Sequence, residues 1–321
     1  MISSVVLSTA AKQNWLRLAL QLQGSVFPIV LPRILMFSGL GMLVALAHDF
    51  HLPVYIQALG DLSNNVACNL VLGLLLVFRT NTAYEKFWEG RKAWGELVVN
   101  IRNLSREIRC SLPAESEQDR QTQETLIKLL TAFAIATKLH LRQLPIEQEL
   151  DELVSPDQLP QLQQSANPPL LISLAIEAYL QQQYQHQNLE VNQRIAMGER
   201  VNQLIVGLTS CERIARTPIP PAYTIYLKRL ILIYCCFLPF NLVERTQAWT
   251  GLIMAVVSFI LFGVEEIGNQ IENPFGTDPN DLPLDQICQV IVENGNLVLS
   301  FDPVSPLVPG IAVSNPALPK L

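Results

Sequence analysis

Residues 54–78 read VYIQALGDLSNNVACNLVLGLLLVF, and this stretch decides the kind of fold. Its only charged residue is Asp61, and about 20 predominantly apolar residues suffice to cross the hydrocarbon core of a bilayer as a helix. Three further apolar stretches lie at 26–47, 225–243 and 246–264. The loops at 48–53 and around 244–245 are short, so each pair of stretches forms a helical hairpin. The sequence therefore predicts an all-α membrane protein with four transmembrane helices per subunit.

The composition of the whole chain agrees with a membrane protein. Of its 321 residues, 50% are hydrophobic and only 16% are charged, with a net charge of −6, whereas soluble domains carry about 25% charged residues. These values exclude a disordered chain and a basic nucleic-acid binder, so no nucleic-acid partner is expected. The six cysteines have no C-x-x-C spacing that would indicate a zinc site. No constellation of nucleophile and base occurs, so an enzyme is not expected.

Charge sets the expected orientation in the membrane. Residues 79–229 hold 17 of the 22 basic residues, and many of these lie near the ends of the apolar stretches, where the positive-inside rule applies best. The chain is therefore expected to cross the cell membrane several times, with both termini and the 79–224 region in the cytoplasm. Apolar residues three or four apart predict cytoplasmic helices at 94–108, 124–144, 172–183 and 189–216.

The same observations divide the chain into five parts. The expected parts are an N-terminal cytoplasmic or interfacial helix (1–25), a first transmembrane hairpin (26–78), a helical cytoplasmic domain (79–224), a second hairpin (225–267) and a C-terminal cytoplasmic segment with a proline-rich tail (268–321). The tail beyond Gly295 contains five prolines and is expected to be extended.

The second apolar stretch changes from polar to apolar along its length. Its polar side chains are Gln57, Asp61, Ser63, Asn64, Asn65 and Asn69. Leu70, Leu74 and Phe78 follow at a spacing of four and share one helical face. Such a helix suits a water-filled vestibule that leads into a hydrophobic constriction. A helix packed at the centre of a four-helix bundle is the alternative.

Three motifs resemble those of the bestrophin family. The first, FRTNTAYEKFWEGRKAWG at 78–95, follows the second apolar stretch; the others are IPPAYT at 219–224 and ENPFGTDPND at 272–281. They occur in order around four apolar stretches, and the resemblance covers most of 15–295. It implies an ion channel in which five identical subunits surround a central pore.

The resemblance also implies a pore neck. In the family, three apolar residues four apart end eight residues before a basic–aromatic pair. Lys86 and Phe87 match that pair, which places the neck at Leu70, Leu74 and Phe78. Periodicity alone selects the same three residues.

A second constriction in the cytoplasm is implied at Ile195. This position comes from counting back from Cys211 on the helix before the third apolar stretch. The alternative is that Ile195 is a core position of an amphipathic helix.

The third motif implies a calcium site. Animal members of the family bind calcium around this motif, and the matching positions here are Gln270, Asn273, Asp278 and Asp281. Calcium takes six to eight oxygen ligands, several of them anionic. The alternative is an Asx-rich turn that caps the preceding helix. No cofactor is expected to be required.

The expected function is passive transport of small monovalent ions, with chloride or a similar anion favoured by the resemblance. Three apolar rings do not select the sign of the ion, so a cation channel is the first alternative. A membrane-anchored scaffold or sensor without ion flux is the second. The expected partners are further copies of the chain, membrane lipid and the permeating ions.

Arg79 is expected to pair with Glu85, Glu89 or Glu96, or to be solvated.

Overall fold

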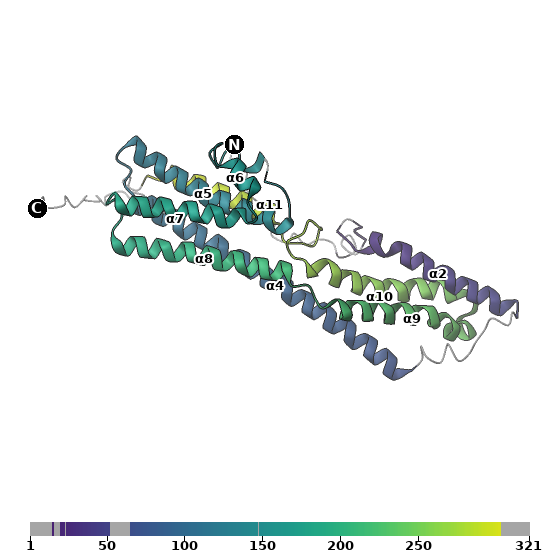
Figure 1. Cartoon of the computed structure of the whole chain (residues 1–321). Coiled ribbons are helices and arrows are strands. Elements are labelled where there is room, and N and C mark those ends of the chain that lie inside the picture. Colours follow the sequence, from purple (N-terminus) through teal and green to yellow (C-terminus); the bar gives the residue numbers. More distant parts are fainter. Residues whose placement is uncertain (1–14, 16–19, 23, 52–64, 147, 303–321) are drawn as a thin grey trace, which may run out of the picture. The chain divides into compact units, whose positions relative to one another are not determined.

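The computed structural model describes residues 15, 20–22, 24–51, 65–146 and 148–302 (Figure 1). Within these ranges the chain is helical and contains no β-strand, so the predicted all-α fold is confirmed. The elements are α2 (Phe27–Asp49), α4 (Val66–Ser111), α5 (Glu117–Arg142), η1 (Gln148–Leu150), α6 (Leu159–Gln164), α7 (Pro168–Gln185), α8 (Val191–Arg216), α9 (Pro221–Thr246), η2 (Gln247–Trp249), α10 (Thr250–Glu272) and α11 (Leu284–Ser300). Most of the N-terminal segment, residues 54–64 of the second stretch and residues 303–321 of the tail lie outside the described residues.

The chain forms two compact units, each with its own apolar core. The first unit contains the described part of Met1–Lys86, together with Pro218–Glu272 and Asp278–Asn280. The second unit contains Phe87–Thr217, Asn273–Thr277 and the described part of Asp281–Leu321. The main segment of the second unit is Phe87–Thr217, and the cytoplasmic domain expected at 79–224 is longer than this segment at both ends.

Helix α4 is much longer than the apolar stretch that begins it. It runs for 46 residues, and the separate helix expected at 94–108 is its continuation. Hydropathy falls at Arg79, but no proline interrupts the chain before Pro113, and most residues between them favour a helix. The end of hydrophobicity is therefore not the end of the helix.

In the first unit, α2 lies beside α10, and α9 packs next to both (Figure 1). Glycines bring α2 and α10 into close contact: a β-carbon at Gly41 would lie 2.8 Å from Met254 Cγ. The hydroxyl of Ser38 donates a hydrogen bond to the carbonyl oxygen of Gly251 at 3.0 Å. Small residues and a hydroxyl of this kind join helices where no water drives their association.

Three helical stretches of the described residues are long and apolar enough to cross a membrane. They are Phe27–Asp49, Val66–Ser111 and Pro221–Glu272, the last of which contains α9, η2 and α10. Less than half of each apolar window is buried within the chain. Large apolar side chains that the chain itself leaves exposed require lipid or protein around them, as in a membrane protein.

The second unit is a helical bundle with a continuous core. Its centre is formed by fully buried Trp94 and Phe133, from α4 and α5. Helix α8 approaches α4 so closely that a β-carbon at Gly207 would lie 2.5 Å from Leu97 Cδ2. Helix α11 belongs to this unit and ends at Ser300, so residues 296–300 are helical and not extended as expected.

Candidate functional site

The first part of α4 presents one apolar face that the other described residues leave exposed. Leu70, Leu74 and Phe78 are 61%, 46% and 59% exposed. Leu72 and Leu76 are only 6% and 8% exposed, because they enter the core shared with α2, α9 and α10. The helical period of 3.6 residues separates the two sets. The three residues predicted to form a neck thus share an exposed stripe, which we call the α4 stripe.

A buried ion pair lies directly after the α4 stripe. Arg79 is 1% exposed, and its Nη2 donates hydrogen bonds to Glu272 Oε2 at 2.5 Å and to Asn269 Oδ1 at 3.2 Å. The other carboxylate oxygen of Glu272, Oε1, accepts the backbone N–H of Ile219 at 2.9 Å. One carboxylate therefore joins residues from all three sequence motifs: Arg79 from the first, Ile219 from the second and Glu272 from the third.

The expectation that Arg79 pairs with a glutamate of its own helix, or is solvated, is wrong. Its partner Glu272 ends α10, 193 residues away in the sequence. The hydroxyl of Tyr223 on α9 adds a second tie to α4 by donating to the carbonyl oxygen of Leu75 at 2.8 Å. These bonds hold α4 at Arg79 and Leu75, which are not part of the α4 stripe.

Basic and acidic side chains also pair elsewhere in the first unit. Arg33 Nη1 lies 3.5 Å from Glu265 Oε2 and 3.2 Å from Glu266 Oε2. Lys228 Nζ lies 3.4 Å from Glu265 Oε1. Helices α2, α9 and α10 are thereby linked through charge at the end of α10 where Glu265 and Glu266 lie.

The turn of the third motif is anchored within each unit. In the first unit, Asn280 Nδ2 donates to Gln270 Oε1 at 2.6 Å. In the second unit, Phe275 is fully buried, and a β-carbon at Gly90 of α4 would lie 3.1 Å from its ring. Asp281 lies so close to Gly276 that its Oδ2 would be 2.5 Å from a β-carbon there.

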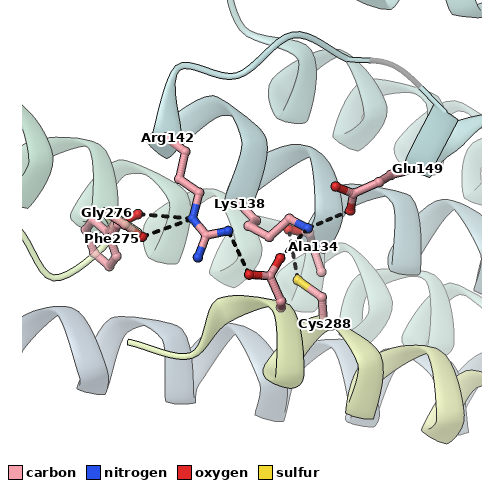
Figure 2. Close-up of polar contacts among 8 residues, drawn as sticks. Ala134, Lys138, Arg142, Glu149, Phe275, Gly276 and Cys288 are labelled. Carbon is pink, nitrogen blue, oxygen red and sulfur yellow. Dashed lines mark hydrogen bonds and ion pairs between the residues drawn. The ribbon is translucent and has the colours of Figure 1, made fainter. Parts of the chain in front are cut away.

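Figure 2 shows how α5 holds this turn in the second unit. Arg142 Nε donates to the carbonyl oxygens of Phe275 and Gly276 at 3.3 and 3.1 Å, and its Nη1 donates to Asp285 Oδ2 at 2.9 Å. Lys138 Nζ donates to Asp285 Oδ1 at 2.9 Å and to Glu149 Oε2 at 2.5 Å. Two basic side chains of one helix thus bind both the backbone of the turn and the start of α11.

These contacts bear on the calcium expectation. Gln270, Asn273, Asp278 and Asp281 offer two carboxylates and two amide oxygens, whereas calcium takes six to eight oxygens. Among the described residues, no group of three or more His, Cys, Asp or Glu side chains could hold a metal ion. Two carbonyl oxygens of the turn that could add to the set already accept hydrogen bonds from Arg142. Calcium binding stays a prediction.

The fold stabilises the charged forms of Lys138 and Asp285 in the cluster around Arg142. Burial disfavours the charge on Lys138, but the hydrogen bonds to Glu149 and Asp285 and the negative charges of these two residues together outweigh it and raise the pKa of Lys138. Hydrogen bonds from Lys138 and Arg142 hold the pKa of Asp285 below its usual range. Burial raises the pKa of the neighbouring Cys288 thiol to about 12, so this cysteine is a neutral core residue.

Ile195 lies on α8 with its side chain exposed. The alternative that it is a core position of this helix is therefore wrong. Its exposure leaves it available to face another surface.

The fold is that of an all-helical membrane protein, with an exposed apolar stripe on a helix that three motifs fix in place. A family model described as bacterial/fungal bestrophin protein matches residues 7–296. The chain belongs to the bestrophin family, and it is an ion channel rather than an enzyme.

Individual relatives and a solved structure agree with this assignment. A voltage-dependent anion channel-forming protein of Nostoc sp. strain PCC 7120 is 49% identical over 295 residues, which are 92% of this chain and 95% of the relative. The voltage-dependent anion channel-forming protein YneE from Escherichia coli strain K12 is 33% identical, covering 87% of this chain and 90% of the relative. The crystal structure of a bacterial bestrophin homologue from Klebsiella pneumoniae superposes with a TM-score of 0.77 at 26% identity, over 85% of this chain and all of that one.

Proposed function

We propose that the chain is one subunit of a homopentameric channel in the cell membrane that passes chloride or a similar monovalent anion down its gradient. The observation that carries the proposal is the exposure of Leu70, Leu74 and Phe78 beside the burial of Leu72 and Leu76. An apolar stripe on a membrane-spanning helix has to meet lipid, another subunit or a pore. Asn65 and Asn69, just before the stripe, are exposed as well, and polar groups facing lipid are costly, so this end of the helix favours a pore over lipid.

Five copies of the α4 stripe would make three stacked apolar rings. With a rise of 1.5 Å per residue, rings four residues apart lie about 6 Å apart along the helix. An ion that loses water in such rings gains no polar ligand in exchange, so the barrier is one of desolvation. Small changes in the width of the rings would then open or close the pore by wetting or dewetting it.

The buried pair Arg79–Glu272 suits this mechanism. Arg79 follows the last ring directly, and its bond to Glu272 ties α4 to the end of α10. Glu272 also binds the backbone of Ile219, just before α9. Rings formed from five subunits stay aligned only if each helix is held at a fixed angle and rotation. In the proposed topology, α2, the first part of α4, α9 and α10 are the four spans, and both termini are cytoplasmic.

The preference for anions rests on the relatives that are named anion channel-forming proteins. The net charge of −6 and the apolar rings leave a monovalent cation channel as the alternative. In this proposal conduction requires no cofactor, and exposed Ile195 on α8 forms the second, cytoplasmic constriction.

Ion replacement in planar bilayers tests the proposal. Purified protein is reconstituted with potassium chloride at different concentrations on the two sides, and the reversal potential is measured. A reversal potential near the chloride equilibrium potential, which moves when gluconate replaces chloride, supports the anion channel. A reversal potential that follows potassium supports the cation channel, and the absence of any current supports the scaffold or sensor.

A further inference from the structure

On the cytoplasmic side of the α4 stripe, the same face of α4 carries a charged residue, Glu85. Asn81 and Glu85 lie three and seven residues after Phe78, and a spacing of three and seven keeps residues on one face of a helix. Both side chains are exposed. Glu85 lies about 10 Å along the axis from Phe78, at 1.5 Å per residue.

The carboxylate of Glu85 has no partner among the described side chains of its own subunit. No ion pair or side-chain hydrogen bond within the described residues engages it, in contrast to Glu89, which pairs with Arg213 at 2.5 Å. The nearest basic residues on α4 are turned away from the stripe. Arg79 is buried against Glu272, and Lys86 is half-buried, one residue and therefore about 100° further around the helix.

We propose that Glu85 is a specificity-determining residue of the channel, and this inference rests on the proposed function. Five copies would place a ring of five carboxylates at the cytoplasmic mouth of the neck. Rings of acidic side chains favour cations in channels. The ring would lower the local concentration of anions and would limit the preference for anions that the relatives' names indicate.

The magnitude follows from the Boltzmann factor. Charges that line a narrow, low-dielectric passage produce potentials of up to several kT. A change of about one kT raises the anion concentration roughly threefold and lowers the cation concentration roughly threefold, which is about a tenfold change in their ratio. The Debye length is about 10 Å at 0.1 M salt and about 3 Å at 1 M, so the effect should fade as salt is raised.

The test compares reversal potentials of purified channels in planar bilayers under a potassium chloride gradient. Glu85→Gln should increase the permeability of chloride relative to potassium by about threefold to tenfold near 0.1 M salt, and by much less near 1 M. Glu85→Asp keeps the charge and should retain the wild-type ratio. Glu115→Gln, which removes an exposed carboxylate outside α4, is the matched control and should also retain it.

Two results would overturn the proposal in different ways. If wild type and Glu85→Gln both conduct with the same reversal potential, Glu85 does not face the pore, while the proposed function stands. If purified wild-type protein passes no ions, the proposed function fails and the role of Glu85 fails with it. If Glu85→Gln does not assemble, Glu85→Asp tests the proposal instead, because it keeps the charge. A change in its permeability ratio of chloride to potassium at low salt would contradict a role that depends on charge alone.

Discussion

Replacement of Glu272 by glutamine should destabilise the protein far more than replacement of an exposed glutamate with a similar partner. Glu272 holds Arg79, and their side chains are only 19% and 2% exposed. Within the described residues, Arg79 Nη1 is already buried without a hydrogen-bond partner, so loss of the carboxylate would leave a buried charge with still less compensation. Removing one member of a buried pair typically costs about 3–5 kcal/mol.

Glu89 supplies the matched control. It pairs with Arg213 at the same 2.5 Å, but the two side chains are 52% and 65% exposed. Exposed pairs contribute about 0–1 kcal/mol. A difference of about 3 kcal/mol corresponds to roughly a hundredfold in the ratio of folded to unfolded protein, because each 1.4 kcal/mol is tenfold.

The assay is thermal unfolding of the detergent-solubilised protein, followed by tryptophan fluorescence. Glu272→Gln should melt several degrees below wild type and Glu89→Gln within about one degree, given the size of the two effects. Equal melting temperatures for the two variants would refute the reasoning, because burial would then not decide the strength of the pair.

Three further predictions concern other parts of the chain. Gly207→Ala should lower the melting temperature because its β-carbon would displace the buried Leu97 side chain, whereas Gly263→Ala, with open space around its β-carbon, should not. Because the pKa of Asp285 is lowered in the folded state, its stabilising effect is present above the ordinary aspartate pKa and is lost as the pH falls through the lowered value. Asp285→Asn should therefore flatten the fall in melting temperature on the acid side, and an unchanged acid profile would contradict this. Channels that carry Asp278→Ala or Asp281→Ala should open as wild type does in calcium and in chelator, and a loss of calcium dependence in these variants alone would establish a calcium site.

The fold was predictable where the signal is local. Apolar length identifies α2, α9 and the start of α4, because a bilayer demands about 20 apolar residues in a row. The helical period by itself assigns Leu74 and Leu76 to different faces of one helix. The full length of α4 was not predictable from hydropathy, since the helix passes Arg79 without a change in backbone conformation.

Contacts between residues that lie far apart in the sequence could not be predicted from the sequence. The chain contains several acidic residues near Arg79 on its own helix, and nothing in the spacing points to Glu272. The only signal was that each of the three motifs adjoins an apolar stretch. The prolines from Pro303 onward suggested an extended tail and obscured the end of α11, although the amphipathic pattern at 284–300 is regular.

The decisive measurement is the single-channel conductance of Phe78→Ala and Leu74→Ala compared with Leu76→Ala. Phe78 and Leu74 are exposed on the α4 stripe, and Leu76 is buried on another face of the same helix. If the stripe forms the neck, its alanine variants widen and wet the constriction and conduct more, or open more often, than wild type. Leu76→Ala should instead leave a cavity and lower stability by about 2–5 kcal/mol with little change in conductance. Equal currents from both kinds of variant in folded oligomers would contradict a pore lined by α4.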